Sequence, residues 1–296
     1  ITSLLLREQQ QTGTISLRNF YIRRSLRIFP LYYAVLAALG AAFLLADPAS
    51  TLRQTFFAEL PFHATYTSNW IESHTFLAIT WSLSTEEQFY LIWPPLFVLL
   101  GRAALWILLP FLALNQLINF GPLDGWLASQ GLAYVSLPIL QSTFTPILLG
   151  VLLAFAMDSP RWRAALARIL SGRGLIIMVA LVLLFANVPG NIRGWPRLGF
   201  QVSAALLLAA IVLNPASRAV RALEWRPLAL LGVVSYGVYL LHIIAVEVSS
   251  RLLGSFAAAW PTAHFLLSLA LTAAAAFASY HLFEARMLRL KDRFRT

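Results

Sequence analysis

The most informative part of this sequence is residues 84–120, which read STEEQFYLIWPPLFVLLGRAALWILLPFLALNQLINF. Two strongly apolar runs, 84–100 and 103–120, are separated only by Gly101 and Arg102. A helix needs about 20 mainly apolar residues to cross the hydrocarbon core of a bilayer, with a range of about 17–25. The segment therefore predicts two membrane-spanning helices, and a long buried hairpin is the alternative.

The composition of the whole chain supports a membrane environment. Of 296 residues, 59% are hydrophobic and 11% are charged, whereas soluble domains have about 25% charged residues. Six further apolar runs complete the pattern, at 28–46, 138–157, 174–191, 199–214, 228–249 and 262–283. We therefore expect an all-α fold, a polytopic bundle of about eight transmembrane helices.

The basic residues indicate how the bundle is oriented. Cytoplasmic loops of membrane proteins carry an excess of Lys and Arg. If the segment before residue 28 is cytoplasmic, both ends of the chain are cytoplasmic. Of the 22 Lys and Arg, only four then lie outside, namely Arg53, Arg193, Arg197 and Arg251. This topology accounts for the net charge of +10, so nucleic acid is not expected as a partner.

Several classes of protein are disfavoured by what the sequence lacks. There is no cysteine, which removes disulfides, thiolate metal sites and cysteine nucleophiles. Walker loops, Gly-x-Ser-x-Gly and His-Glu-x-x-His motifs do not occur, so no motor, hydrolase or zincin site is expected, and no metal site. No Asp or Glu falls near the middle of a predicted span, which disfavours an ion-coupled transporter.

A first polar cluster lies just before the first span, in residues 20–30, FYIRRSLRIFP. On a helix, Arg24 and Arg27 share one face because they are three residues apart. Two guanidinium groups in that arrangement could clamp a phosphate. From spacing alone, an anchor at the inner membrane surface is the favoured interpretation.

A second cluster, residues 80–94, reads TWSLSTEEQFYLIWP. Ser84 followed by Glu87 is typical of a capping box at a helix start. Glu86 has no such structural explanation, and it is a candidate base or substrate ligand at the end of a span. Trp81 is better explained as an interfacial or packing aromatic.

A third cluster, residues 231–242, places polar groups inside an apolar span. Ser235, Tyr239 and His242 fall at i, i+4 and i+7, which predicts one polar stripe on a helix. Hydrogen bonding between helices is the favoured interpretation. His242 is also a possible proton carrier, with Glu247 as the nearest carboxylate in sequence.

Two other polar regions stand out. The longest polar connection, 47–83, lies on the predicted outer face and contains Glu59 and His63; long loops are often functional. His281 and Glu284, three residues apart at the inner end of the last span, are expected to form an interfacial pair.

These clusters together resemble a known family. RRSLRIFP at 23–30 and WSLSTEEQFYLIWP at 81–94 resemble the integral-membrane acyltransferase family 3, which contains O-antigen and other polysaccharide O-acetylases. LGVVSYGVYLLH at 231–242 and SYHLFE at 279–284 support the resemblance. Ala285 departs from the family, which often has proline after the glutamate.

The resemblance implies a fold of about ten membrane helices, two of which would precede Ile1. Residues 1–6 resemble the end of the second of these helices. The chain 1–296 is then expected to be a single membrane domain that is truncated at its N-terminus and has no soluble C-terminal domain. The Arg and His regarded as catalytic in the family belong to the first helix. A naturally short homologue that does not turn over is the alternative.

The reaction implied by the resemblance moves an acyl group, usually acetyl, from cytoplasmic acyl-CoA to a glycan hydroxyl. The acceptor would be extracytoplasmic or lipid-linked, such as lipopolysaccharide or peptidoglycan, and the location a bacterial inner membrane. Acyl-CoA would be a co-substrate, and no tightly bound cofactor is expected. Arg24 and Arg27 match the family's Arg-x-x-Arg pair, which is expected to bind the CoA phosphates. Glu86 matches the family's acidic position and would orient the acceptor hydroxyl or handle its proton, together with the family's histidine.

The expected acceptor-binding residues are Trp81, Ser82, Tyr90, Tyr239 and His242. The expected partners are a glycan and the lipid bilayer. The main alternative from another class is a non-catalytic membrane subunit, or a carrier, that binds a lipid-linked glycan and has no use for CoA.

Overall fold

The computed structural model describes residues 1–132, 137–141, 143–189 and 193–294, and all regular elements within these ranges are helices. The chain forms two compact units. Unit 1 consists of Ile1–Ile15, Asn69–Glu72 and Trp81–Ala222, and unit 2 of Ser16–Ser68, Ser73–Thr80 and Leu223–Thr296. Each unit is described by itself.

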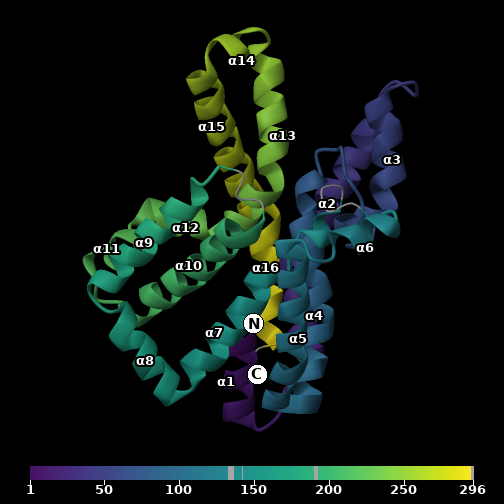
Figure 1. Cartoon of the computed structure of the whole chain (residues 1–296). Helices are drawn as coiled ribbons and strands as arrows, with labels where there is room; N and C mark the ends of the chain where they lie inside the picture. Colours follow the sequence, from purple (N-terminus) through teal and green to yellow (C-terminus); the bar gives the residue numbers. More distant parts are fainter. Residues whose placement is uncertain (133–136, 142, 190–192, 295–296) are drawn as a thin grey trace. The chain divides into compact units, whose positions relative to one another are not determined.

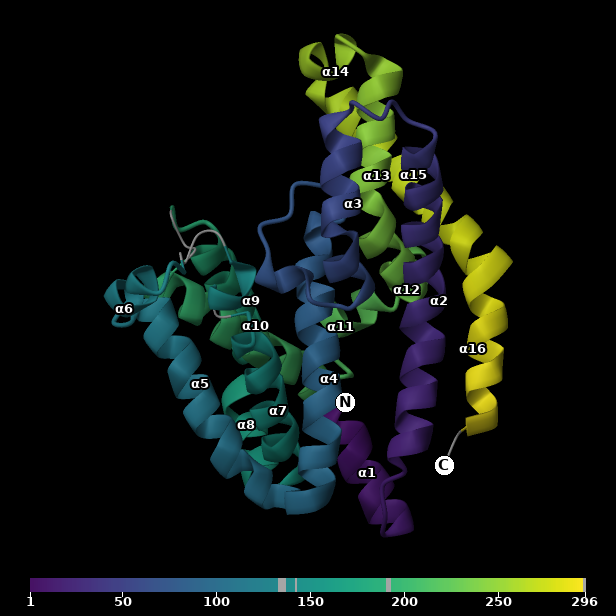
Figure 2. The same cartoon turned by 90° about the vertical axis from the view of Figure 1, so that its right-hand side faces the viewer.

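Unit 1 contains most of the middle of the chain. Its elements are α1 (Thr2–Thr12), α4 (Trp81–Leu100), η3 (Gly101–Ala104), α5 (Leu105–Phe120), α6 (Asp124–Ser129), η4 (Pro138–Leu140), α7 (Thr145–Asp158), α8 (Pro160–Leu170), α9 (Arg173–Ala186), α10 (Gly194–Leu213) and α11 (Arg218–Leu223). Helices α4 and α5 run in opposite directions on either side of η3 (Figure 2). The prediction of two helices within 84–120 is therefore confirmed.

Aromatic packing and a polar contact hold the centre of unit 1 together. The rings of Trp93 and Phe97 on α4 stack with centroids 6.1 Å apart, and Phe155 of α7 packs against both. The indole N–H of Trp93 donates to Thr2 Oγ1 over 3.0 Å. A buried indole needs such an acceptor, so this bond fixes the start of α1 against α4.

Unit 2 contains residues from the early part and from the last part of the chain. Its elements are α2 (Leu17–Leu44), α3 (Thr51–Ala64), η2 (Ala78–Thr80), α12 (Arg226–Val233), α13 (Ser235–Leu253), α14 (Phe256–Ala259), α15 (Pro261–Ser279), the π-helical turn η5 (Tyr280–Glu284), α16 (Ala285–Lys291) and η6 (Asp292–Phe294). The short helix η1 (Ser68–Trp70) lies where the two units meet in sequence. Helices α13 and α15 lie side by side and are connected through α14 (Figure 1).

Five helical segments of the described residues are long and apolar enough to cross a membrane: Leu17–Leu44, Ala78–Phe120, Gly194–Leu213, Ser235–Leu253 and Pro261–Leu290. A sixth results if α8 and α9, which meet at 79°, form one broken span. The predicted count of eight spans is not confirmed by this criterion. α7 covers the predicted span 138–157 with only 14 residues, and positions 142 and 190–191 lie outside the described residues.

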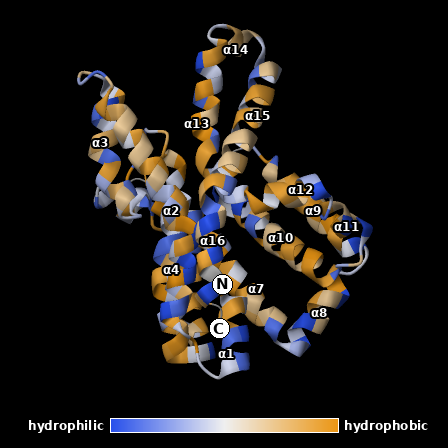
Figure 3. Cartoon of the chain, turned by 180° about the vertical axis from the view of Figure 1, so that it is seen from behind, coloured by the Kyte–Doolittle hydropathy of each residue, from blue (hydrophilic) through white to orange (hydrophobic). Residues whose placement is uncertain are grey.

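The apolar helices carry large exposed side chains, as a lipid environment requires. The long helices α10, α13 and α15 are mainly hydrophobic along their surfaces (Figure 3). Leu99 and Trp106 are 79% and 76% exposed. Contiguous exposed apolar surface of this kind is typical of membrane-facing helices, so the all-α membrane bundle predicted from the sequence is confirmed.

The polar connection 47–83 is not an irregular loop. It contains α3, a helix of 14 residues, followed by η1 and η2. Glu59 and His63 lie one turn apart on the buried side of α3. The sequence did not predict this helix because its buried face is partly polar.

Candidate active site

Helix α4 brings two of the predicted site residues together. The hydroxyl of Tyr90 donates to Glu86 Oε2 over 2.9 Å. Residues four apart on a helix lie on the same face, so the bond follows from the uninterrupted helix Trp81–Leu100. A carboxylate held by a phenol has a fixed orientation, which a general base or a substrate ligand requires.

The predicted capping box at Ser84 and Glu87 is wrong. α4 begins at Trp81, directly after η2, so Ser84 lies inside the first helical turn and is fully buried. The helix starts earlier because η2, which ends at Thr80, leads into it without a gap. Trp81 and Ser82 occupy the first two positions of α4 and are half-buried.

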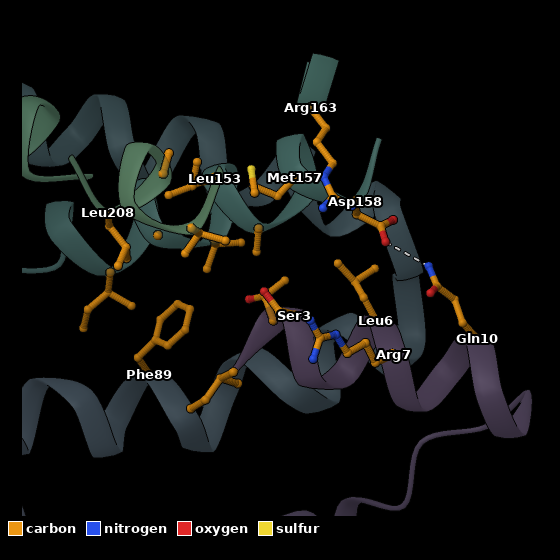
Figure 4. Close-up of a pocket in the computed structure, with 18 of the residues that line it drawn as sticks. Ser3, Leu6, Arg7, Gln10, Phe89, Leu153, Met157, Asp158, Arg163 and Leu208 are labelled. Atoms are coloured by element: carbon orange, nitrogen blue, oxygen red, sulfur yellow. Dashed lines mark hydrogen bonds between the residues drawn. The ribbon is translucent and has the colours of Figure 1, made fainter. Parts of the chain in front are cut away.

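A cavity of about 740 Å³ lies beside Tyr90 in unit 1 (Figure 4). Residues of five helices line it, from α1, α4, α7, α8 and α10. Apolar side chains such as Phe89, Leu153 and Leu208 form much of its wall. Tyr90 thus connects the cavity wall to Glu86, which is not itself a lining residue.

Charged groups gather at another part of the same cavity. Arg7 of α1 and Arg163 of α8 are exposed cavity-lining residues. Asp158, at the end of α7, accepts a hydrogen bond from Gln10 over 2.8 Å (Figure 4) and forms an ion pair with Arg102. Guanidinium groups beside an apolar wall suit a ligand with phosphate groups and a thin, less polar arm.

Tyr239 and His242 lie on α13 in unit 2. The Tyr239 hydroxyl donates to the carbonyl of Ile79 over 2.6 Å, and His242 Nδ1 lies 2.7 Å from the carbonyl of Tyr239. The Tyr239 bond joins α13 to η2, in agreement with the favoured interpretation of hydrogen bonding between helices, whereas the His242 contact lies within α13. Arg251 donates a hydrogen bond to Glu247 over 2.6 Å, so the partner of Glu247 is an arginine one helical turn later in α13.

A buried polar network that the sequence did not predict lies beside this tyrosine contact, on α3 and the segment Ser73–Thr80. His63 is fully buried, and its Nδ1 lies 3.0 Å from Thr80 Oγ1. The Thr80 hydroxyl donates to the carbonyl of Leu77 over 2.7 Å. Because the Thr80 hydrogen is used in that bond, Thr80 Oγ1 is the acceptor in its contact with His63 Nδ1. In the neutral imidazole, the proton is therefore assigned to Nδ1.

Glu59 is the acceptor at the other side of this network. It receives hydrogen bonds from Ser73 Oγ over 2.6 Å, from the backbone N–H of His74 over 3.0 Å and from Thr75 Oγ1 over 3.2 Å. His63 Nε2 lies 3.4 Å from Glu59 Oε2. The network therefore fixes the segment that leads into α4.

The same contacts change the acid–base behaviour of both groups. Burial opposes ionisation of Glu59, but the hydrogen bonds from Ser73, His74 and Thr75 outweigh it and lower the pKa of Glu59 below its ordinary value. Burial lowers the pKa of His63, against the opposing effect of Glu59. At neutral pH the pair is a carboxylate beside a neutral imidazole.

Arg24 and Arg27 both lie on α2 in unit 2. Glu284, in η5 of the same unit, is buried and accepts a hydrogen bond from Ser279 over 2.8 Å. The predicted interfacial pair of His281 and Glu284 is wrong, because the π-helical turn leaves His281 exposed and turns Glu284 inward.

The structure thus brings together Glu86 and Tyr90 in unit 1, and Tyr239 and His242 in unit 2. Spacing could have found the Glu59–His63 contact, because the two residues are four apart. No local signal pointed to the cavity, which depends on distant segments. Among the described residues, no group of three or more His, Cys, Asp or Glu could hold a metal ion.

Comparison with known proteins shows the family of the chain. A family model described as an acyltransferase domain matches residues 3–281. The chain is similar to the peptidoglycan O-acetyltransferase OatA of Listeria monocytogenes, with 28% identity over 283 residues, which cover 86% of this chain and 44% of OatA. No solved structure matches the chain.

Two further relatives are also named as O-acetyltransferases. YrhL of Bacillus subtilis, provisionally named a peptidoglycan O-acetyltransferase, is 28% identical over 312 residues, which cover 96% of this chain and 48% of YrhL. A provisionally named O-acetyltransferase of Staphylococcus aureus is 26% identical over 282 residues, 83% of this chain and 44% of the relative. The chain spans less than half the length of these relatives. With a matching model over residues 3–281, the chain belongs to acyltransferase family 3.

Proposed function

We propose that this chain transfers an acetyl group from acyl-CoA, supplied from the cytoplasm, to a hydroxyl of a glycan on the outer side of a bacterial inner membrane. Family membership supports acyl transfer, and the names of OatA and YrhL support peptidoglycan as the glycan. The excess of arginine on one predicted side supports the direction of transfer.

One observation carries this proposal: Tyr90, which lines a cavity of about 740 Å³, donates to the carboxylate of Glu86. In the proposed reaction, the acceptor hydroxyl attacks the thioester carbonyl and a new C–O bond forms. The C–S bond breaks, and the hydroxyl proton passes through Glu86 to the departing thiolate. Glu86 would orient the hydroxyl and handle its proton, with the family's histidine as the resemblance implies.

The donor is proposed to use two pairs of arginines. Arg24 and Arg27 match the family's Arg-x-x-Arg pair and would bind CoA phosphates through charge-assisted hydrogen bonds. Arg7 and Arg163 line the cavity in unit 1, where their charge would attract the anionic end of the donor. The apolar wall would accommodate the arm that carries the acyl group.

Two sets of residues are proposed for acceptor recognition, each within its own unit. In α4 these are Trp81, Ser82 and Tyr90, and in α13 they are Tyr239 and His242. Aromatic faces and hydroxyl groups are the usual partners of sugar rings and their hydroxyls. The hydrogen bonds already made by Tyr90 and Tyr239 hold these side chains in place.

Inverted membrane vesicles carrying the native protein test the donor site, because they expose the cytoplasmic face. The KM for acetyl-CoA is measured for Arg24→Ala/Arg27→Ala and for Arg7→Ala/Arg163→Ala. Loss of charge-assisted bonds predicts a rise of about tenfold or more in each double variant. An unchanged KM in either one contradicts the role of that pair.

The same vesicles separate the enzyme from a carrier that only binds a lipid-linked glycan. An acyltransferase releases free CoA when donor and acceptor are both present, and Tyr90→Phe slows this release without preventing it. A carrier releases no CoA under any condition. Absence of CoA release from the native protein with a peptidoglycan acceptor would therefore refute the proposed reaction.

A further inference from the structure

The charged end of the cavity in unit 1 contains a carboxylate, that of Asp158 on α7, as well as the two arginines Arg7 and Arg163. Asp158 lies at the other end of the cavity from Phe89 and Leu208 (Figure 4). In the part of the chain that the structure describes, no carboxylate forms an ion pair with Arg7 or Arg163. A carboxylate at this place needs an explanation, because it would repel the phosphates that the proposed function assigns to the two arginines.

Both oxygens of the Asp158 carboxylate are already engaged. Gln10 of α1 donates to Oδ1 over 2.8 Å, and Arg102 of η3 donates to Oδ2 and forms an ion pair with it. The Asp158 side chain is 15% exposed and that of Arg102 is 61% exposed. Arg102 is not among the lining residues that the structure describes. The charge of Asp158 is thus neutralised by a cation that does not itself line the cavity.

A second contact holds the Arg102 side chain on α7. Its guanidinium carbon lies 5.8 Å from the ring centroid of Phe155, which precedes Asp158 by about one helical turn. A guanidinium over an aromatic ring is attracted to the face of that ring. An arginine that served only as an anchor at the inner membrane surface would need neither of these contacts.

We infer that Arg102 is a positioning residue for donor binding, which neutralises Asp158 and so keeps Arg7 and Arg163 available for the phosphates of acyl-CoA. This inference rests on the proposed function. Without Arg102, the carboxylate of Asp158 stays in the cavity wall, and Arg7 and Arg163 are the lining cations with which it can pair. A phosphate then has to compete with this carboxylate, so the donor binds less tightly.

The test measures CoA binding to the native purified protein by calorimetry. Arg102→Ala is expected to weaken CoA binding about two- to fivefold, the factor that corresponds to one exposed ion pair. The kcat at saturating acetyl-CoA should stay within about twofold of the native value. The matched control is Arg161→Ala, which removes an exposed positive charge from α8 that does not line the cavity and should change nothing.

A second substitution distinguishes charge neutralisation from a direct role of Arg102. Asp158→Asn keeps an oxygen acceptor for Gln10 but removes the charge, so Arg102→Ala/Asp158→Asn should bind CoA at least as tightly as the native protein. If Arg102 bound the phosphate itself, or only held the fold, the double variant would bind as weakly as Arg102→Ala.

The outcomes separate this inference from the proposed donor site. Unchanged CoA binding in Arg102→Ala, or absence of rescue by Asp158→Asn, overturns the inference while the phosphate role of Arg7 and Arg163 stands. Unchanged CoA binding in Arg7→Ala/Arg163→Ala shows that the proposed donor site in this cavity is wrong, and the inference fails with it.

Discussion

Replacement of Glu59 by alanine tests whether the buried network on α3 stabilises unit 2. The carboxylate receives three hydrogen bonds, from Ser73, the N–H of His74 and Thr75, at 2.6, 3.0 and 3.2 Å. A hydrogen bond to a charged group contributes about 1.5–3 kcal/mol. Ser73 is half-buried and can bond to water instead, so about 3 kcal/mol should be lost rather than the full sum.

The assay is thermal unfolding of the purified protein, followed by the intrinsic fluorescence of its nine tryptophans. A loss of about 3 kcal/mol corresponds to a fall in Tm of about 6–12 °C for a large chain. Glu59→Gln retains one oxygen acceptor for the His74 N–H and should lose about 1 kcal/mol. Glu247→Ala, which removes a more exposed partner of Arg251, is the matched control. If Glu59→Ala melts at the same temperature as this control, the network does not stabilise the fold.

Two further changes have direct readouts. The folded protein keeps His63 neutral because its pKa lies below 6.5, so the unfolded chain takes up a proton first as the pH falls. The contribution of His63 to stability is therefore complete above about pH 6.5 and declines as the pH falls toward the folded pKa. His63→Gln should flatten this decline of Tm with falling pH. An unchanged dependence of Tm on pH would contradict the assignment of a neutral, buried His63. Gly199→Ala would place a Cβ 2.5 Å from the ring of Phe185. This overpacking should lower the stability by about 1–3 kcal/mol. An unaltered Tm would show that α9 and α10 can move apart at this point without loss of stability.

The apolar runs predicted most of the helices because length and hydropathy are local properties. α2, α10, α13 and α15 each overlap a predicted span, although α2 begins eleven residues earlier, at Leu17. α3 was missed because its buried side carries Glu59 and His63, whose hydrogen-bond partners come from a later segment. The start of α4 was placed three residues late, because a capping box at Ser84 looks the same in sequence whether or not a preceding turn extends the helix.

Part of the candidate site follows from local sequence, and part depends on residues that are distant in sequence. The bond between Glu86 and Tyr90 follows from helical spacing, and both residues were predicted from the sequence. The cavity beside Tyr90 depends on five helices from three separate parts of the chain, which no local pattern can reveal. The bond between Ser279 and Glu284 depends on one π-helical turn, whose position the sequence did not indicate.

The most direct test of the central claim follows labelled acetyl from acetyl-CoA into peptidoglycan as a base-labile ester. Inverted vesicles with the native protein are compared with Glu86→Gln and with the neighbouring control Glu87→Gln. General acid–base groups contribute about 10²–10⁴-fold to a reaction rate, so Glu86→Gln should lose at least about a hundredfold while Glu87→Gln retains activity. Full ester formation by Glu86→Gln would contradict the assignment of the acceptor site to α4.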